Sequence, residues 1–260
     1  MIANQIWQTY RYRATGLEPD YGTDHRGFWY IPLVATLARA GLLSQLDLEW
    51  EPPELAEPGL EGAAGLYLLY QTLLGELIGD EALFTFRELG FRDPRPDLRS
   101  IGRRRPEVVL VAEKTSLIPF VQRISEELGI STLILGGLPA LVSTEFFASA
   151  LPTGLGRLRV IAYVDFDPGG WIAAESFAGQ LRRFGLECTE PEFVVRPERF
   201  TREEIELYSI PIPTPTPQIE GKVRAWLARS GGIEGEARVL HADRLRPVER
   251  VLEAVREILA

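Results

Sequence analysis

Short continuous apolar runs alternate with longer segments of helical periodicity from residue 107 onward. The runs predict four strands, at 108–112, 131–135, 159–164 and 187–195. The segments between them predict helices at 116–128, 139–150 and 170–184. Strands that alternate with helices are typical of βαβ units, and continuous apolar runs are typical of strands buried on both faces. We therefore expect an α/β fold, a parallel sheet flanked by helices.

The first part of the chain has a different pattern. Apolar residues recur at helical spacing over 28–43 and 60–83, and the patterns before residue 107 are helical rather than strand-like. This change predicts two parts. The first is a mostly helical region at 1–106, and the second is an α/β domain at 107–260 with a carboxy-terminal helical extension.

The segment after the predicted sheet is marked by a capping pattern and by prolines. Thr201 and Glu204 form a capping box that opens a short helix, and four prolines make 209–217 a stiff extended loop. We expect helices at 218–229 and 246–260 and a short strand at 237–241.

Acidic side chains stand where two of the predicted strands end. Glu113 and Lys114 follow the first apolar run, and Asp165 and Asp167 follow the third. The carboxyl ends of parallel strands meet at one edge of a sheet, and residues two apart in an extended chain point to the same face, so the three carboxylates can converge. Carboxylate oxygens suit a hard divalent cation, so the sequence predicts a metal site here.

The order of these motifs resembles the Toprim domain. An apolar strand that ends in Glu113-Lys114 is followed, further along the chain, by one that ends in the Asp-x-Asp-Pro motif of Asp165 and Asp167. The similarity is in particular to this domain in the A subunit of topoisomerase VI and in the related meiotic double-strand-break protein. It covers 107–260, and it is weak over 1–106.

A second segment of the same family is matched in part. Residues 135–139 and 143–146 are similar to its Gly-Lys-Gly-Tyr-Pro and Thr-Arg-x-Phe motifs, and lie between the two acidic motifs as expected. Gly136 and Thr144 stand where the family has basic residues. This departure puts in doubt any DNA contact at those two positions.

The resemblance implies a function for the acids. It implies a Toprim-like, Rossmann-like sheet in which Glu113, Asp165 and Asp167 hold Mg²⁺, with Glu113 as ligand or acid/base residue. It further implies magnesium-dependent DNA strand scission or transesterification, a homodimer, an ATPase partner of the B-subunit type, and a winged helix, here degenerate, before the Toprim domain.

The resemblance also points to a tyrosine nucleophile before the Toprim domain. Tyr10 and Tyr12 are the candidates, and Arg11 between them could stabilise developing charge or contact DNA. The alternative is that both rings are packing residues of an amphipathic element. In that case the metal site could still direct a hydrolytic nuclease that uses water.

The net charge of −9 is unusual for a protein that binds nucleic acid, but its distribution is uneven. Between residues 92 and 105 there are six arginines and two aspartates, a local balance of +4. We expect Arg103, Arg104 and Arg105 to contact DNA together with Lys114. The alternative is that this segment is a solvated linker.

Other classes of function remain open from the sequence. An Asp-x-Asp strand also occurs in haloacid-dehalogenase-like phosphatases, and Asp167 with Pro168 could simply form a turn. A Toprim fold without catalysis would be an interaction subunit of a DNA-processing complex. Cys188 is the single cysteine, and no apolar stretch is long enough for a membrane span, so we expect a cytoplasmic, nucleoid-associated protein.

Overall fold

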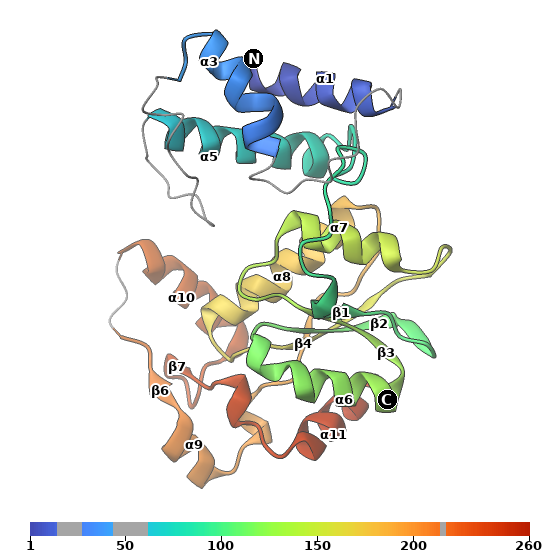
Figure 1. Ribbon diagram of the computed structural model, residues 1–260. Helices are drawn as coiled ribbons and strands as arrows, with labels where there is room; N and C mark the ends of the chain where they lie inside the picture. The colour runs from blue at the N-terminus through green and yellow to red at the C-terminus, as the bar shows by residue number, and fades with distance from the viewer. Residues whose placement is uncertain (15–27, 44–61, 214–216) are drawn as a thin grey trace. The chain divides into compact units, whose positions relative to one another are not determined.

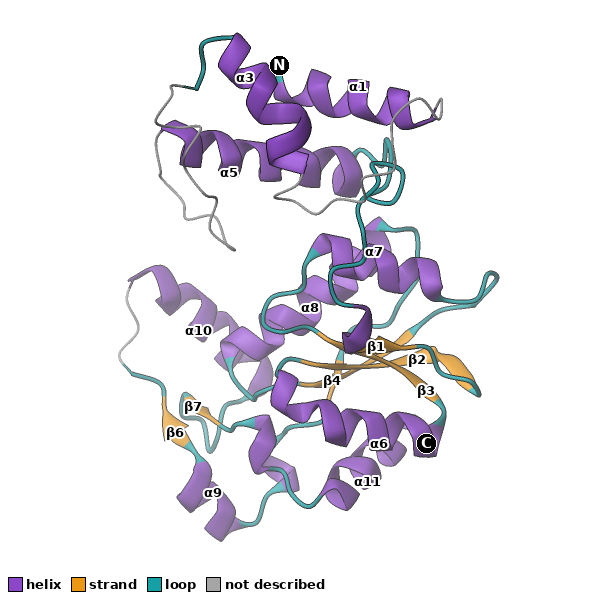
Figure 2. Ribbon diagram, viewed as in Figure 1, coloured by secondary structure: helices purple, strands orange, loops and turns teal. Residues whose placement is uncertain are grey.

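The chain forms two compact units, Met1–Pro94 and Arg95–Ala260, which we call the amino-terminal unit and the sheet unit. The structure, a computed structural model, describes residues 1–14, 28–43, 62–213 and 217–260 (Figure 1). Helices make up the regular structure of the first unit, and all strands of the central sheet lie in the second (Figure 2). The predicted mixed α/β class is confirmed.

The described part of the amino-terminal unit is built from helices. They are α1 (Ile2–Ala14), a π-helical segment (Trp29–Val34), α3 (Ala35–Arg39), α5 (Gly62–Gly75) and a second π-helical segment (Glu76–Asp80). Their core is aromatic. Trp29 packs edge-to-face on Tyr67 with ring centroids 5.2 Å apart, and Phe28 stacks on Tyr70 with ring centroids 5.9 Å apart. Among the described residues of this unit there is no β-hairpin that could serve as the wing of a winged helix.

The sheet unit is organised around five strands in the order β1-β3-β2-β4-β5. They are β1 (Arg99–Ser100), β2 (Arg105–Ala112), β3 (Ile130–Ile134), β4 (Arg159–Tyr163) and β5 (Glu192–Phe193). β2 pairs in parallel with β3 and with β4, β4 pairs in parallel with β5, and β1 runs antiparallel to β3. The sheet is therefore mostly parallel, as the pattern predicts.

Both faces of the sheet are covered by helices, namely α6 (Ile118–Leu128), α7 (Leu141–Ala150), α8 (Pro168–Arg183) and α11 (Val248–Leu259). Alternate residues of β2 point to opposite sides. Leu110 belongs to the apolar cluster of α6 and α11, whereas Val109 and Val111 belong to the cluster of α7 and α8. Figure 1 shows the two helix pairs on opposite faces. An apolar residue is needed at every position of such a strand, which explains the continuous run.

The boundary between the units differs from the prediction at residue 106. The chain divides after Pro94, because β1 adds to the sheet beside β3, where Ser100 lies opposite Thr132 and their hydroxyl oxygens are 2.9 Å apart. A polar strand of two residues has no apolar pattern to predict it. The expected strand at 187–195 is also reduced to β5, preceded by a single bridge between Leu158 and Cys188.

The carboxy-terminal part packs beside the sheet. Its elements before α11 are α9 (Arg202–Tyr208), β6 (Ile210–Pro211), α10 (Pro217–Ser230) and β7 (Arg238–Val239). The predicted capping box opens α9: Thr201 Oγ1 accepts from the backbone of Glu204, and Glu204 accepts from the backbone of Thr201. The predicted stiff extended segment at 209–217 begins with β6, which pairs antiparallel with β7.

Gly102 should be intolerant of any side chain, because a Cβ there would lie 2.4 Å from the carbonyl oxygen of Gly129. We expect Gly102→Ala to destabilise the protein by about 1–3 kcal/mol, the usual cost of overpacking. Gly156→Ala is the matched control, since a Cβ there meets nothing within 4 Å. Urea unfolding of both variants tests this, and equal midpoints would contradict it.

Candidate functional site

The candidate site lies where the chain leaves the two central strands in opposite directions. After β2 the chain returns to β3 on one side, and after β4 it returns to β5 on the other. Such a switch point leaves a crevice at the carboxyl ends of the strands, where open α/β sheets bind ligands. Glu113 and Lys114 follow β2 at this edge, and Asp165 and Asp167 follow β4.

Asp165 is the centre of the site and is only 4% exposed. Its Oδ2 atom lies 2.7 Å from Nζ of Lys114 and 2.8 Å from Nδ1 of His241. Its Oδ1 atom accepts a hydrogen bond of 2.7 Å from the backbone N–H of Ala242. Three donors from two distant segments therefore hold one buried carboxylate.

These donors determine the ionisation of Asp165. Burial by itself raises the pKa of this carboxyl, but the hydrogen bonds from Ala242, Lys114 and His241, together with the charge of Lys114, lower the pKa below its ordinary value. A buried carboxylate that accepts several hydrogen bonds is stabilised in its charged form. Asp165 therefore stays ionised.

His241 is the functional-site residue that the sequence prediction missed. A carboxylate can only accept, so the contact with Asp165 requires the hydrogen on Nδ1 of His241, and leaves Nε2 without a partner among the described residues. The side chain is 37% exposed. A pair of backbone hydrogen bonds between Phe166 and Leu240 brings it beside Asp165. The two residues are separated by 76 positions, so no local motif signals the contact.

The segment that carries His241 is also held from within the core. The hydroxyl of Tyr163, on β4, donates a 3.0 Å hydrogen bond to the carbonyl oxygen of Ala242. Burial, followed by the charge of Asp243, raises the pKa of Tyr163, so this phenol remains a donor. β4 thus fixes both ends of the contact, Asp165 directly and Ala242 through Tyr163.

Glu113 lies close to the two aspartates, and a hydrogen bond from the backbone of Asp165 reaches its carboxyl group. Burial raises its pKa, and repulsion from Asp165 and Asp167 raises it further, against a smaller lowering by Lys114. Its Oε2 atom is buried and has no hydrogen-bond partner. Glu113 is therefore near enough to both aspartates for their charges to raise its pKa. The orphaned oxygen is a place where a cation would be stabilised.

Asp167 has a structural contact as well as a position at the site. Its Oδ1 atom accepts a 2.6 Å hydrogen bond from the backbone N–H of Gly170 and so caps α8, while Pro168 occupies the first turn. A Cβ on Gly170 would lie 2.6 Å from the carbonyl oxygen of Asp165, so only glycine allows this close approach. Asp167 can form the turn with Pro168 and also take part in the site, because capping uses only one of its two carboxylate oxygens.

The three acids do not form a ready-made metal cage in this arrangement. Across residues 1–14, 28–43, 62–213 and 217–260, no group of three or more His, Cys, Asp or Glu side chains is placed to hold a metal ion. Lys114 instead supplies the positive charge next to Asp165. Glu113 keeps a buried oxygen without a partner, capping engages only one oxygen of Asp167, and carboxylate oxygens are the kind of ligand that a divalent cation prefers.

The tyrosine candidates belong to the amino-terminal unit. Tyr10, Arg11 and Tyr12 all lie on α1. The centroid of the Tyr10 ring lies 5.2 Å from that of Phe84, on which it stacks, and 5.4 Å from that of Trp7. These contacts are those expected if Tyr10 is a packing residue. Arg11 is exposed, and the side chain of Tyr12 lies outside the described part of the structure.

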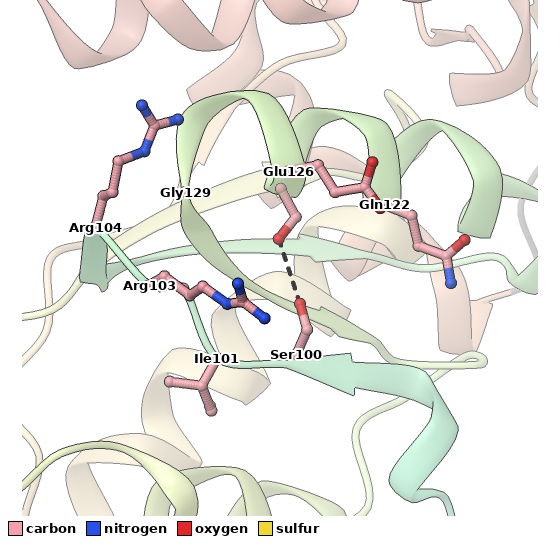
Figure 3. A pocket seen from close by; sticks show the side chains of 9 residues that line it. Ser100, Ile101, Arg103, Arg104, Gln122, Glu126 and Gly129 are labelled. Carbon is pink, nitrogen blue, oxygen red and sulfur yellow. Dashed lines mark hydrogen bonds between the residues drawn. The ribbon is translucent and has the colours of Figure 1, made fainter.

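The predicted DNA-binding arginines lie at the opposite edge of the sheet from the acids. Arg103, Arg104 and Arg105 precede or begin β2, and Glu113 follows its other end, about 26 Å away at the usual rise of a strand. Arg103 and Arg104 line an open pocket of about 820 Å³ with residues of α6 (Figure 3). Arg104 also bonds the carbonyl oxygen of Glu127. The structure brings Lys114 to the acids but not these arginines.

Thr144 stands at the position where the Toprim motif has a basic residue, and its side chain is buried. Thr144, on α7, is fully buried, and its hydroxyl bonds the carbonyl oxygen of Ala140 and the side chain of Gln180. This side chain cannot reach a DNA phosphate. The doubt raised by the sequence at Thr144 is therefore supported by its burial.

No protein-family model matches this chain, and no curated protein matches it significantly. None of the described helices is both long and apolar enough to cross a lipid bilayer.

The raised pKa of Glu113 predicts a stability effect in metal-free protein. An acid with a raised folded pKa binds protons more tightly in the folded state, so stability falls as pH rises from about 4.5 through that raised value. We expect Glu113→Gln to raise Tm at neutral pH in EDTA and to flatten this pH dependence. Thermal unfolding measures both.

Glu107→Gln is the control for this prediction, since Glu107 is a partly exposed acid on the same strand, with a side chain 41% exposed. Its Tm should match that of the wild type. A lower Tm for Glu113→Gln at neutral pH would show that the ionised carboxylate is stabilising, contrary to the expectation.

Proposed function

We propose that the sheet unit is a Toprim-like domain that cleaves or transesterifies DNA phosphodiester bonds with Mg²⁺. The observation that carries this proposal is the buried, unpartnered oxygen of Glu113, set against Asp165 and Asp167 at the switch point of the sheet. Three acids that repel one another at a ligand-binding edge need an external cation. The motif order and the mostly parallel sheet give further support.

The residues of the site would have distinct parts in the reaction. Glu113, with its raised pKa, can exchange a proton closer to neutral pH than an exposed glutamate can. The ammonium group of Lys114, once it leaves Asp165, can pair with a phosphate oxygen. Bound Mg²⁺ would stabilise charge on the attacking and leaving oxygens and orient the phosphodiester.

The nucleophile in this proposal is a tyrosine of α1 or a water molecule. The packing of Tyr10 against Phe84 favours Tyr12 or water over Tyr10. With one such site in each chain, cutting both strands needs two copies, so we propose a homodimer, with an ATPase partner of the B-subunit type.

A second candidate function is a non-catalytic interaction subunit. The observation that favours it is the 2.7 Å ion pair between Lys114 and Asp165, which already compensates one of the acids from within the chain. The phosphatase alternative would need Asp165 as nucleophile, and both oxygens of Asp165 already accept hydrogen bonds. The two proposals therefore differ in the role of Lys114: in the catalytic protein its ammonium group gives way to a cation, and in the interaction subunit it stays paired with Asp165.

Asp167→Asn should abolish nicking of supercoiled plasmid in Mg²⁺ while preserving the fold, because an amide oxygen can still cap α8 but carries no charge. We expect a loss of at least about a hundredfold in rate, in the range of removed charge stabilisation at active sites. Asp97→Asn is the control, since Asp97 is an exposed acid of the same unit.

The same assay distinguishes the nucleophiles. A covalent protein–DNA adduct that disappears in Tyr12→Phe but persists in Tyr10→Phe indicates transesterification, and nicking without an adduct indicates attack by water. A wild-type protein that neither nicks plasmid nor forms an adduct in Mg²⁺ would contradict the leading proposal.

Replacing Lys114 tests whether its ammonium group competes with a divalent cation for Asp165. Lys114→Met should raise the affinity for Mn²⁺, used as a probe in calorimetric titration, by about tenfold, the effect of removing roughly one favourable charged contact. Lys222→Met is the matched control, because Lys222 is the only other lysine of the chain and lies exposed on α10. Unchanged or weaker Mn²⁺ binding would favour the interaction subunit.

A further inference from the structure

A second concave site lies beyond β5, apart from the acids. It has a volume of about 360 Å³, and the lining residues used below are Trp171, Glu192, Phe193, Arg196, Arg199 and Arg229. We call it the arginine pocket. Because β5 runs parallel to β4, Arg196 follows β5 on the same side of the sheet on which Asp165 follows β4. The pocket lies along β5, with Glu192 and Phe193 on the strand and Arg196 beyond its carboxyl end.

The arginine pocket presents hydrogen-bond donors that lack acceptors. Trp171 is 6% exposed, and its Nε1–H is buried without a partner. The Nε–H of Arg199 is likewise buried and unpaired. Arg196 is exposed and has no ion-pair partner in the described part of the chain. Buried donors without acceptors cost free energy, so a ligand rich in acceptors would be stabilised here.

Carboxylates engage two of the pocket's arginines but leave Arg196 unpaired among the described residues. Glu192, the one acid that lines the pocket, is engaged by Arg159 through contacts of 2.7 and 3.1 Å. Arg229 pairs with Glu175 at 2.5 Å, and Arg199 pairs with Glu257, whose side chain is 60% exposed. Exposed ion pairs contribute only about 0–1 kcal/mol, so a phosphate can replace Glu257 at little cost.

The aromatic residues give the pocket a rigid, flat wall. The rings of Trp171 and Phe193 are stacked with centroids 4.0 Å apart and planes 8° apart. The guanidinium of Arg229 lies over the Trp171 ring at 5.8 Å from its centroid. Arginine beside packed aromatic rings suits a phosphate group, since the guanidinium pairs with phosphate and the rings hold the neighbouring groups in place.

We propose that the arginine pocket binds a phosphate of a single-stranded nucleic acid, on the strand that the acids cleave. An ionised phosphodiester offers acceptors and no donors, which matches the unpaired N–H groups of Trp171 and Arg199 and the guanidinium of Arg196. The assignment to the cleaved strand rests on the proposed function. The phosphate site itself rests only on the pocket.

The test is a titration of the full chain with a fluorescein-labelled oligothymidylate in EDTA, followed by anisotropy at several salt concentrations. Arg196→Ala should raise Kd by about tenfold and reduce the salt slope by about 0.7, the value for one phosphate contact on a single strand. Trp171→Phe, which keeps an aromatic ring but removes the indole donor, should weaken binding by about threefold. Arg202→Ala is the matched control, since Arg202 is an exposed arginine of α9 outside this pocket.

Two results would overturn the inference. Equal Kd values for Arg196→Ala and Arg202→Ala, with both variants folded by thermal unfolding, would show that the pocket contacts no phosphate of the strand. If Arg196→Ala weakens binding of dTMP or inorganic phosphate but not of the oligonucleotide, the pocket serves a free phosphate ligand and the strand assignment fails.

The test is independent of catalysis because EDTA removes divalent cations. Oligonucleotide binding that depends on Arg196, without any plasmid nicking in Mg²⁺, would leave the phosphate site standing and count against cleavage. If the wild-type protein nicks plasmid but Arg196→Ala leaves the Kd for the oligonucleotide unchanged, cleavage is supported and the phosphate site is not.

Discussion

The carboxylate of Asp165 is the constraint on which the arrangement of the site depends. A buried charge is tolerated only when donors surround it, and here they come from the end of β2, through Lys114, and from the segment after β7, through His241 and Ala242. Tyr163 ties the same segment to β4. One buried acid therefore fixes how the carboxy-terminal part of the chain closes over the sheet edge.

The charge balance at this edge is incomplete. Lys114 compensates Asp165, but Glu113 keeps a buried oxygen without a donor and a raised pKa. Lysine suits a position of this kind, because its ammonium is a compact charge on a flexible stem and can move, whereas the planar fork of arginine favours a fixed bidentate pair. The chain has only two lysines, and one of them stands here. Lys114 pairs with Asp165, while the buried Oε2 atom of Glu113 keeps no partner.

Two groups of arginines in the sheet unit bear on the proposed contact with nucleic acid. Arg103 to Arg105 lie at the start of β2, remote from the acids, while the arginine pocket lies along β5, with Arg196 beyond the carboxyl end of that strand. In a chain of net charge −9, contact with a nucleic acid must depend on such local groups. In our proposal the groups beyond β5 act with the acids, whereas those before β2 lie at the other end of the strands.

The sequence by itself determined the α/β class and most of the strands and helices of the sheet unit, because apolar periodicity is a local property. It also predicted that Glu113, Asp165 and Asp167 follow strands at one end of the sheet, because successive parallel strands end on the same side. The antiparallel β1, the unit boundary at Pro94 and the shortened β5 depend on backbone pairing between segments with little apolar pattern. The contact of His241 with Asp165 and the clustering of Arg196, Arg199 and Arg229 were decided only by the tertiary structure. Their partners lie far apart in the chain, and no spacing rule connects residues that only packing brings together.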